Sequence, residues 1–286
     1  MHEHVMKIKN CTGKDLYTNS SLLVEGILDI YKKYNFSDPG LGYDVYNIEA
    51  EACGQELIYF EDSSPQTSQK EFLIKNENDF KKLKNIKMGK DGRMPFVIDA
   101  LKTYQKRYQS TPPLQFCAPF SLAVAIYGYE KLVTDMYTKP KLIHKLMNII
   151  TENILIPWIN YQKSIIPNWE VALGADALAS PPNLTLDLLE EFVVPYILKL
   201  KDECGDNVGV VNWWGESHVK DLDRFLALKY KVSPDNNILR VQDPDLEEID
   251  LNLITDFASS KNMKLTFGIG AKILSSGSVE DIKQRV

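Results

Sequence analysis

The sequence predicts an α/β barrel that forms a single domain over residues 1–286. In the second half, segments typical of a strand, a polar loop and a helix repeat at regular spacing, which indicates a parallel sheet with crossover helices. Polar residues recur where each predicted strand ends. A barrel gathers such residues at one rim, whereas an open sheet spreads them apart. The length also fits, because one barrel typically needs about 250 residues.

The first half is expected to supply two helices and two short strands. Apolar side chains recur at helical spacing in both helices, and Phe96, Ile98 and Leu101 form the expected buried face of the second. Alternating residues indicate the strands. The expected elements are helices over 22–34 and 94–108, strands over 43–48 and 55–60, and a solvated lysine-rich segment over 70–90.

The second half alternates apolar runs with amphipathic segments. Pro157 and Pro195 each fall inside a helical pattern, where proline is expected to kink or end the helix. The expected strands are 113–119, 169–175, the apolar run that begins at Asn207, 238–241 and 263–267. The expected helices are 120–137, the segment that begins at Pro140, 185–200, 221–228 and 251–259.

Side chains at these strand ends are the candidate site residues. Carboxylates suited to proton or substrate handling are the catalytic candidates, and amide, indole and thiol groups can contact a substrate. The catalytic candidates are Glu49, Glu51 and Asp176, and the substrate-binding candidates are Asn212, Trp214, Cys117 and Asp243.

Several of these candidates have a structural alternative. Glu49 and Glu51 would project on one face if strand geometry continued, and would otherwise make structural hydrogen bonds. Asp176 either lines the site or caps its loop. Cys117 can be a small buried hydrophobe. Of the adjacent Trp213 and Trp214, one is expected to pack under a helix and the other to line the barrel mouth, and the alternative is that both pack in the core.

Glu216 and His218 form the candidate metal pair. Both are competent zinc ligands, and a third would have to come from another loop. In the structural alternative, both residues begin the following helix and face solvent or its dipole.

Composition excludes several classes of protein. The 33 basic and 39 acidic residues give a net charge of −6, and the chain has no long basic run, so nucleic acid is not an expected partner. No apolar stretch is long enough to cross a membrane, and the amino terminus has no signal-peptide core. The four cysteines form no CxxC pair, which favours reduced thiols and a cytoplasmic location.

Several blocks resemble the uroporphyrinogen decarboxylase superfamily. Residues 117–123 (CAPFSLA), continued by Gly128-Tyr129-Glu130, are similar to its "G-P-F-T-x-A … G-x-E" block, and residues 175–181 (ADALASP) are similar to "D-x-x-A-S". Residues 49–54 (EAEACG) resemble the "E-A-E-A-x-G" of the corrinoid-dependent methyltransferase branch. The order of these blocks along the chain supports the resemblance to the superfamily, and the EAEACG block favours the methyltransferase branch.

The resemblance implies a TIM-type (β/α)8 barrel and an enzyme that moves a methyl group. The methyl group would pass between a corrinoid carried by a partner protein and a small acceptor or methoxylated donor, with zinc bound at the site. The branch's zinc-binding His-x-Cys-Gly corresponds here to residues 212–215 (NWWG), so both ligands are replaced. The family's last strand would fall beyond Val286, so the barrel is expected to be shortened or partial.

Two alternatives stay open. The first is uroporphyrinogen decarboxylase of tetrapyrrole biosynthesis. The resemblance disfavours it, because that branch holds carboxylates with an arginine-rich amino-terminal motif, and no arginine precedes Leu22 here. The second is a non-catalytic barrel that binds a corrinoid protein, which the missing His-x-Cys suggests.

Overall fold

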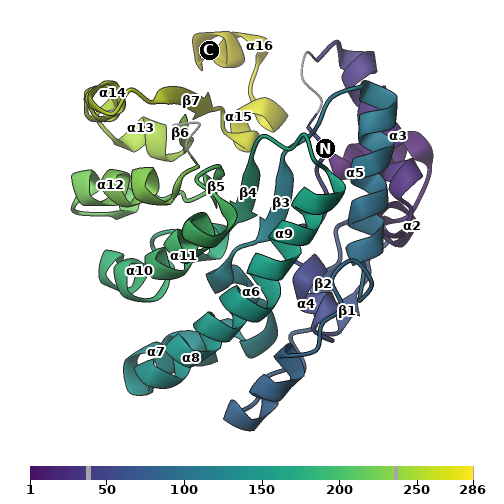
Figure 1. Cartoon of the computed structure of the whole chain (residues 1–286). Coiled ribbons are helices and arrows are strands. Elements are labelled where there is room, and N and C mark those ends of the chain that lie inside the picture. Colours follow the sequence, from purple (N-terminus) through teal and green to yellow (C-terminus); the bar gives the residue numbers. More distant parts are fainter. Residues whose placement is uncertain (37–39, 235–237, 286) are drawn as a thin grey trace.

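Parallel strands surrounded by helices form the centre of the structure (Figure 1). The computed structural model describes residues 1–36, 40–234 and 238–285. In these residues, one sheet has the order β3-β4-β5 and another pairs β6 with β7, all parallel. The strands are β3 (Leu114–Cys117), β4 (Ala172–Ala175), β5 (Val208–Val210), β6 (Ile238–Gln242) and β7 (Lys264–Gly268). Each overlaps a predicted strand, so the α/β class is confirmed.

The three-stranded sheet is buried, as its near-continuous apolar sequence predicts. Phe116, Gly174 and Val210 stand opposite one another in its register. A Cβ on Gly174 would lie 2.8 Å from the Phe116 ring and 2.9 Å from a Val210 methyl group. Glycine is therefore required here, because a larger residue would separate the strands or displace the phenylalanine.

Helices return the chain between successive strands, as parallel pairing requires. Gly128, with a φ of 88°, divides the predicted helix 120–137 into two. A π-helical turn, Thr151–Leu155, precedes Pro157, which lies in the first turn of the next helix, where a missing N–H costs little. The helices between β3 and β5 are α6 (Pro119–Tyr127), α7 (Tyr129–Thr138), α8 (Pro140–Ile150), α9 (Ile156–Ile165), α10 (Leu186–Phe192) and α11 (Val194–Cys204).

Two helices that follow β7 have no buried residues in the described chain. Ser278 and Asp281 form the reciprocal hydrogen bonds of a capping box at the start of the last helix. Within the described residues, no helix is both long and apolar enough to span a bilayer. The helices after β5 are α12 (Leu222–Val232), α13 (Asp245–Glu248), α14 (Leu251–Ser260), α15 (Ala271–Ser276) and α16 (Val279–Arg285).

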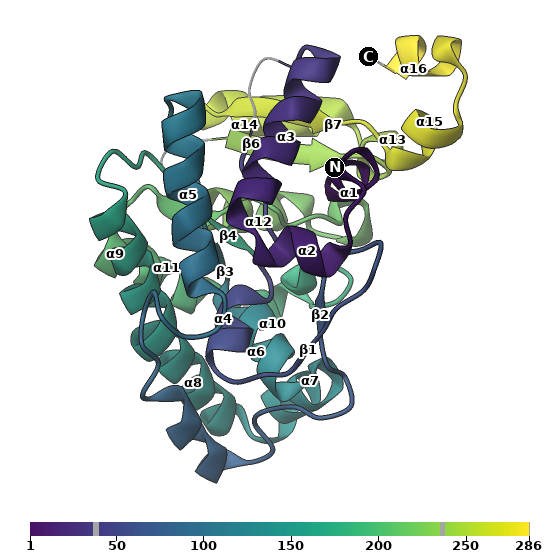
Figure 2. The same cartoon turned by 90° about the vertical axis from the view of Figure 1, so that its right-hand side faces the viewer.

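The amino-terminal part packs as a helical layer, and α3 and α5 lie side by side in it (Figure 2). Both overlap predicted helices. The elements of this part are α1 (His2–Lys9), α2 (Gly13–Thr18), α3 (Ser20–Tyr34), α4 (Ile48–Ala52), the antiparallel strands β1 (Leu57–Ile58) and β2 (Gln66–Thr67), a 3₁₀ helix (Glu77–Leu83) and α5 (Met94–Tyr108).

The predicted strand over 43–48 is wrong. These residues form a turn that leads into α4. The Tyr43 hydroxyl donates to the Gln115 carbonyl, and the Gln115 amide donates to the Leu41 carbonyl, both at 3.0 Å. Side-chain hydrogen bonds therefore take the place of a strand beside β3. Alternation of apolar residues does not distinguish such a turn from a strand.

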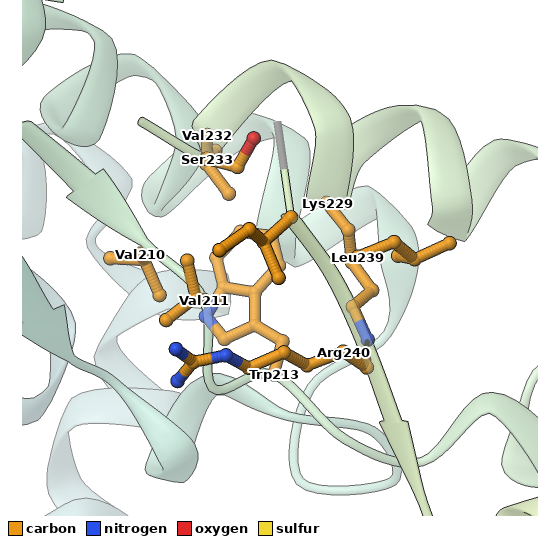
Figure 3. Close-up of a pocket in the computed structure, with 9 residues that line it drawn as sticks. Val210, Val211, Trp213, Lys229, Val232, Ser233, Leu239 and Arg240 are labelled. Atoms are coloured by element: carbon orange, nitrogen blue, oxygen red, sulfur yellow. Dashed lines mark hydrogen bonds between the residues drawn. The ribbon is translucent and has the colours of Figure 1, made fainter. Parts of the chain in front are cut away.

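The predicted barrel does not close within the described residues. No ladder joins β5 to β6, and β1 pairs only with β2. A cavity of about 10 Å³ lies between β5, α12 and β6, where Trp213, Lys229 and Arg240 approach one another (Figure 3). The pair β6-β7 has a small apolar core of its own, formed by Leu226, Leu239, Val241, Leu246, Ile254 and Ala258.

Arg93, which precedes α5, ties the amino-terminal layer together. Its Nη1 and Nη2 donate to the two oxygens of Asp44 at 2.9 and 2.6 Å, and its Nε donates to Glu51 at 2.7 Å. Nη1 also donates to the Tyr17 carbonyl at 3.1 Å. The Arg93 and Asp44 side chains are 8% and 1% exposed. Burial of this kind requires that each charge keep its partner.

Replacing Arg93 with alanine is expected to lower the free energy of unfolding by about 3–5 kcal/mol, because Asp44 would stay buried without its counter-charge. Urea unfolding followed by circular dichroism measures the change. Arg107→Ala is the matched control, since Arg107 lies in the last turn of α5 and its ion pair with Glu25 is exposed to solvent. Equal losses in the two variants would contradict the role given to the buried network.

Candidate active site

A buried carboxylate, Asp176, stands directly after β4. Its Oδ1 accepts hydrogen bonds from the backbone N and the Oγ of Ser121, at 3.1 and 2.9 Å. Its Oδ2 accepts one from Trp213 Nε1 at 3.2 Å. Burial raises the pKa of Asp176 to about 7, although these donors favour the charged form. One side chain thus connects the chain segments that follow β3, β4 and β5.

Asn212 and Tyr46 extend this network toward the surface. The Asp176 backbone N–H donates to Asn212 Oδ1 at 2.9 Å, and Asn212 Nδ2 donates to the Tyr46 hydroxyl at 3.0 Å. The same hydroxyl accepts from the Ala177 N–H at 3.1 Å. Asn212 therefore lies beside Asp176, as the gathering of strand ends predicts. Tyr46 is not among the predicted site residues, since it falls in the segment assigned wrongly to a strand.

A pocket of about 460 Å³ opens beside Tyr46. The turn before α4, the hairpin β1-β2 and the loop after β4 form its walls. None of the described residues that line it is lysine, arginine or histidine. The lining residues are Tyr43, Asp44, Val45, Tyr46, Asn47, Ser64, Pro65, Gln66, Thr67, Gln69 and Leu178.

Glu49 lies beneath this region in α4 and is fully buried. Its Oε1 accepts the Cys117 backbone N–H at 3.0 Å, and its Oε2 has no hydrogen-bond partner among the described residues. Burial raises the pKa of Glu49 to about 8. At neutral pH the side chain is therefore mostly an uncharged acid, which can remain buried without a cation beside it.

The prediction that Glu49 and Glu51 project on one face is wrong. Both lie in α4, where a separation of two residues turns a side chain by about 200°. Glu49 points to Cys117, whereas Glu51 pairs with Arg93. The structure therefore brings Glu49 together with Cys117 and assigns Glu51 to the amino-terminal network.

Cys117 ends β3 and is fully buried. Its Sγ donates to the Ala118 carbonyl at 3.8 Å, and burial raises its pKa well above the usual value. The thiol is therefore not a reactive thiolate. This agrees with the alternative of a small buried hydrophobe, and Cys117 is not among the residues that line the pocket beside Tyr46.

Glu216 and His218 do not fit the expected zinc pair. Glu216 is 1% exposed and forms an ion pair with the buried ammonium of Lys229, whereas His218 is exposed. In the part of the chain that the structure describes, no three His, Cys, Asp or Glu side chains form a group that could hold a metal ion. Both residues lie in a short 3₁₀ turn that precedes α12.

The Glu216–Lys229 pair has a structural role, because it joins two parts of the fold. Lys229 Nζ also donates to the Arg240 carbonyl at 2.6 Å, so it connects the loop after β5 to β6. Burial raises the pKa of Glu216 and lowers that of Lys229, while their mutual attraction opposes both changes. Gly215 just before has a φ of 96°, and a Cβ there would lie 2.2 Å from the Pro181 carbonyl oxygen.

Trp213 and Trp214 separate, as two adjacent residues were expected to do. Trp213 is 1% exposed and donates to Asp176, a role that its apolar character did not indicate. Trp214 is partly exposed, and its ring lies 5.6 Å from Lys229 Nζ. Contact between Trp214 and a substrate stays a prediction.

Asp243 lies apart from the Asp176 network, at the end of the second sheet. Its carboxylate accepts the Gly270 N–H at 2.8 Å and pairs with Arg285 of α16. It lines a different pocket of about 550 Å³, formed with α15. The candidate residues expected at one rim therefore lie at the ends of two separate sheets. If Asp243 contacts a substrate, the substrate would bind in this second pocket.

Replacing Glu216 with glutamine is expected to lower the free energy of unfolding by about 3 kcal/mol, because Lys229 would lose its buried counter-charge. His218→Ala should leave urea unfolding nearly unchanged, since the imidazole is exposed. Measurements with and without added zinc distinguish a buried ion pair between Glu216 and Lys229 from a zinc site formed by Glu216 and His218. A zinc-dependent stabilisation that both substitutions abolish would contradict the ion-pair assignment.

The chain is similar to two proteins that are named methyltransferases. The methylated-thiol–coenzyme M methyltransferase of Methanosarcina mazei is 22% identical over 214 residues, which cover 71% of this chain and 56% of that protein. The chain thus spans little more than half the length of this relative. A solved methyltransferase structure from Methanosarcina mazei has a TM-score of 0.77 at 17% identity, over 99% of this chain and 79% of the other. At this identity, the likeness shows the fold.

The family comparison covers most of the sequence. The model of the uroporphyrinogen decarboxylase (URO-D) family matches residues 1–243. This range includes β3, β4, β5 and the whole Asp176 network, together with the EAEACG and CAPFSLA blocks. The resemblance expected from those blocks is therefore confirmed, and the chain belongs to the uroporphyrinogen decarboxylase family.

Proposed function

We propose that this chain is a methyltransferase of the URO-D family that moves a methyl group between a corrinoid protein and a small acceptor or methoxylated donor. The observation that carries the proposal is that the curated relative and the similar structure are both named methyltransferases. We further propose that the two parallel sheets belong to one TIM-type (β/α)8 barrel. Its carboxyl-terminal rim would then hold Asp176, Asn212 and the pocket beside Tyr46.

The chemistry of the pocket argues against the decarboxylase alternative. A porphyrinogen carries several carboxylates, which need arginine or lysine partners. The described residues that line the pocket include no cationic side chain and do include Asp44. Arg93 lies behind Asp44, where Asp44, Glu51 and the Tyr17 carbonyl occupy its donors. The site therefore supports a small substrate better than a polycarboxylate.

Asp176 would act as a positioning residue. It is fully buried, so it holds Ser121, Trp213 and, through its backbone, Asn212 in fixed places. Asn212 in turn orients the Tyr46 hydroxyl at the pocket wall. Fixed polar groups of this kind orient a substrate before reaction without a further cost in conformational entropy. We assign no step to zinc, because Glu216 and His218 do not fit it.

The lack of fit to zinc also favours a second candidate, a barrel that binds a corrinoid protein without catalysis. In this case the Glu216–Lys229 pair would replace an ancestral metal site with a structural contact. The two candidates differ in one measurable property, which is the appearance of a methylated product.

The purified chain, given methylcobalamin and 2-mercaptoethanol, is expected to form the methyl thioether. In this reaction the thiolate sulfur gains the S–CH₃ bond as the cobalt–carbon bond breaks and leaves Co(I). Asp176→Asn should lower the rate about 100-fold through misplacement of its partners. Mass spectrometry of the thioether measures the rate. Asp187→Asn, at an exposed position on α10, is the control. Absence of product with any methylated corrinoid would favour the non-catalytic candidate.

The stability of the protein is expected to fall as pH rises from about 4.5 to about 8, because folded Glu49 retains a proton that the unfolded chain releases near 4.5. Asp176 adds to this trend up to about pH 7. Glu49→Gln should reduce the slope by about one proton and should leave stability near pH 5 little changed. Urea midpoints across this range measure the slope. Glu152→Gln, at an exposed position, should retain the full slope, and an unchanged slope in Glu49→Gln would contradict the buried proton.

A further inference from the structure

The Tyr46 hydroxyl has a hydrogen that no described residue accepts. Its oxygen accepts two hydrogen bonds, from Ala177 N and Asn212 Nδ2. A phenol oxygen has two acceptor positions and one hydrogen. With both acceptor positions occupied, the hydrogen is directed away from these two donors. Tyr46 lines the pocket of about 460 Å³, so a bound molecule can take this hydrogen.

The walls of the pocket have more apolar than polar surface, and they bring no free charge to it. The Asp44 carboxylate is neutralised by Arg93 and also accepts from Asn47 Nδ2 at 3.3 Å. Hydroxyl and amide groups supply most of the remaining polar surface. Val45, Pro65 and Leu178 supply apolar surface. An anion in the pocket would lose its hydration, and the described lining residues offer no cation to replace it.

We propose that this pocket binds an uncharged small molecule with a methyl-bearing apolar part, and that Tyr46 donates a hydrogen bond to an oxygen of this ligand. The inference rests on the proposed function for the statement that the ligand carries the transferred methyl group. Binding itself depends only on the pocket. Tyr46 thereby selects the ligand, and Asn212 and Ala177 hold its hydroxyl in place.

Two probes that share a methylthio group test the selection by charge. These are 2-(methylthio)ethanol, which is neutral, and 2-(methylthio)ethanesulfonate, which is an anion. Ligand-observed NMR titration of the full chain measures both dissociation constants. The alcohol is expected to bind at least about tenfold more tightly. Equal binding, tighter binding of the sulfonate, or no binding of the alcohol would overturn the proposal.

Two substitutions locate the binding. Tyr46→Phe should weaken binding of the alcohol about tenfold, which is the usual effect of one lost hydrogen bond. Tyr137→Phe, at a position 67% exposed on α7, should leave binding unchanged. Because Tyr46→Phe also removes an acceptor from Asn212, Leu178→Lys provides a second test on the exposed wall. This cation should let the sulfonate bind, and failure of both substitutions to change binding would refute the assignment of the pocket.

Methyl transfer is measured separately with the same protein. If the alcohol binds as expected and no methylated product forms with any corrinoid, the inference stands and the proposed function fails. If product forms while the alcohol does not compete with the acceptor, the methyltransferase assignment stands and the pocket assignment fails.

Discussion

The arrangement around the site depends on one desolvated carboxylate, that of Asp176. Without water, its two oxygens need donors from the protein, and they obtain three from Ser121 and Trp213. These donors follow β3 and β5, whereas Asp176 follows β4, so satisfying one side chain aligns three consecutive strand ends. Asn212 transmits this alignment to Tyr46. The pocket wall is thus positioned by a group that no ligand can reach directly.

Buried charges elsewhere follow the same constraint. Asp44 and Glu51 share Arg93 in the amino-terminal layer, and Glu216 takes Lys229 between the two sheets. In each case a buried charge is neutralised by a partner within the protein. A neutralised charge does not attract a charged ligand. The pocket beside Tyr46 therefore has no free cation among the described residues that line it. The chemistry proposed for its ligand follows from this internal pairing.

Part of the site could be predicted from the sequence. Asp176 and Asn212 end neighbouring parallel strands, and such ends meet at one edge of a sheet, so their proximity follows from topology. Tyr46 could not be found in this way, because its place depends on a turn that resembles a strand in its pattern of apolar residues. The pairing of Glu216 with Lys229 could not be predicted from the sequence either. Lys229 lies 13 residues later on α12, and only the fold shows that its ammonium turns inward to a carboxylate.

The sequence by itself determined the α/β class, the parallel strands, the principal helices and the membership of the URO-D family, because apolar periodicity and short motifs are local properties of the chain. Tertiary structure alone decided which charges are neutralised and which polar groups face the pocket. It separated Glu49 from Glu51 and joined Glu216 to Lys229. These outcomes depend on burial and on partners distant in sequence, since the free energy of a charge or a hydrogen bond is set by its surroundings.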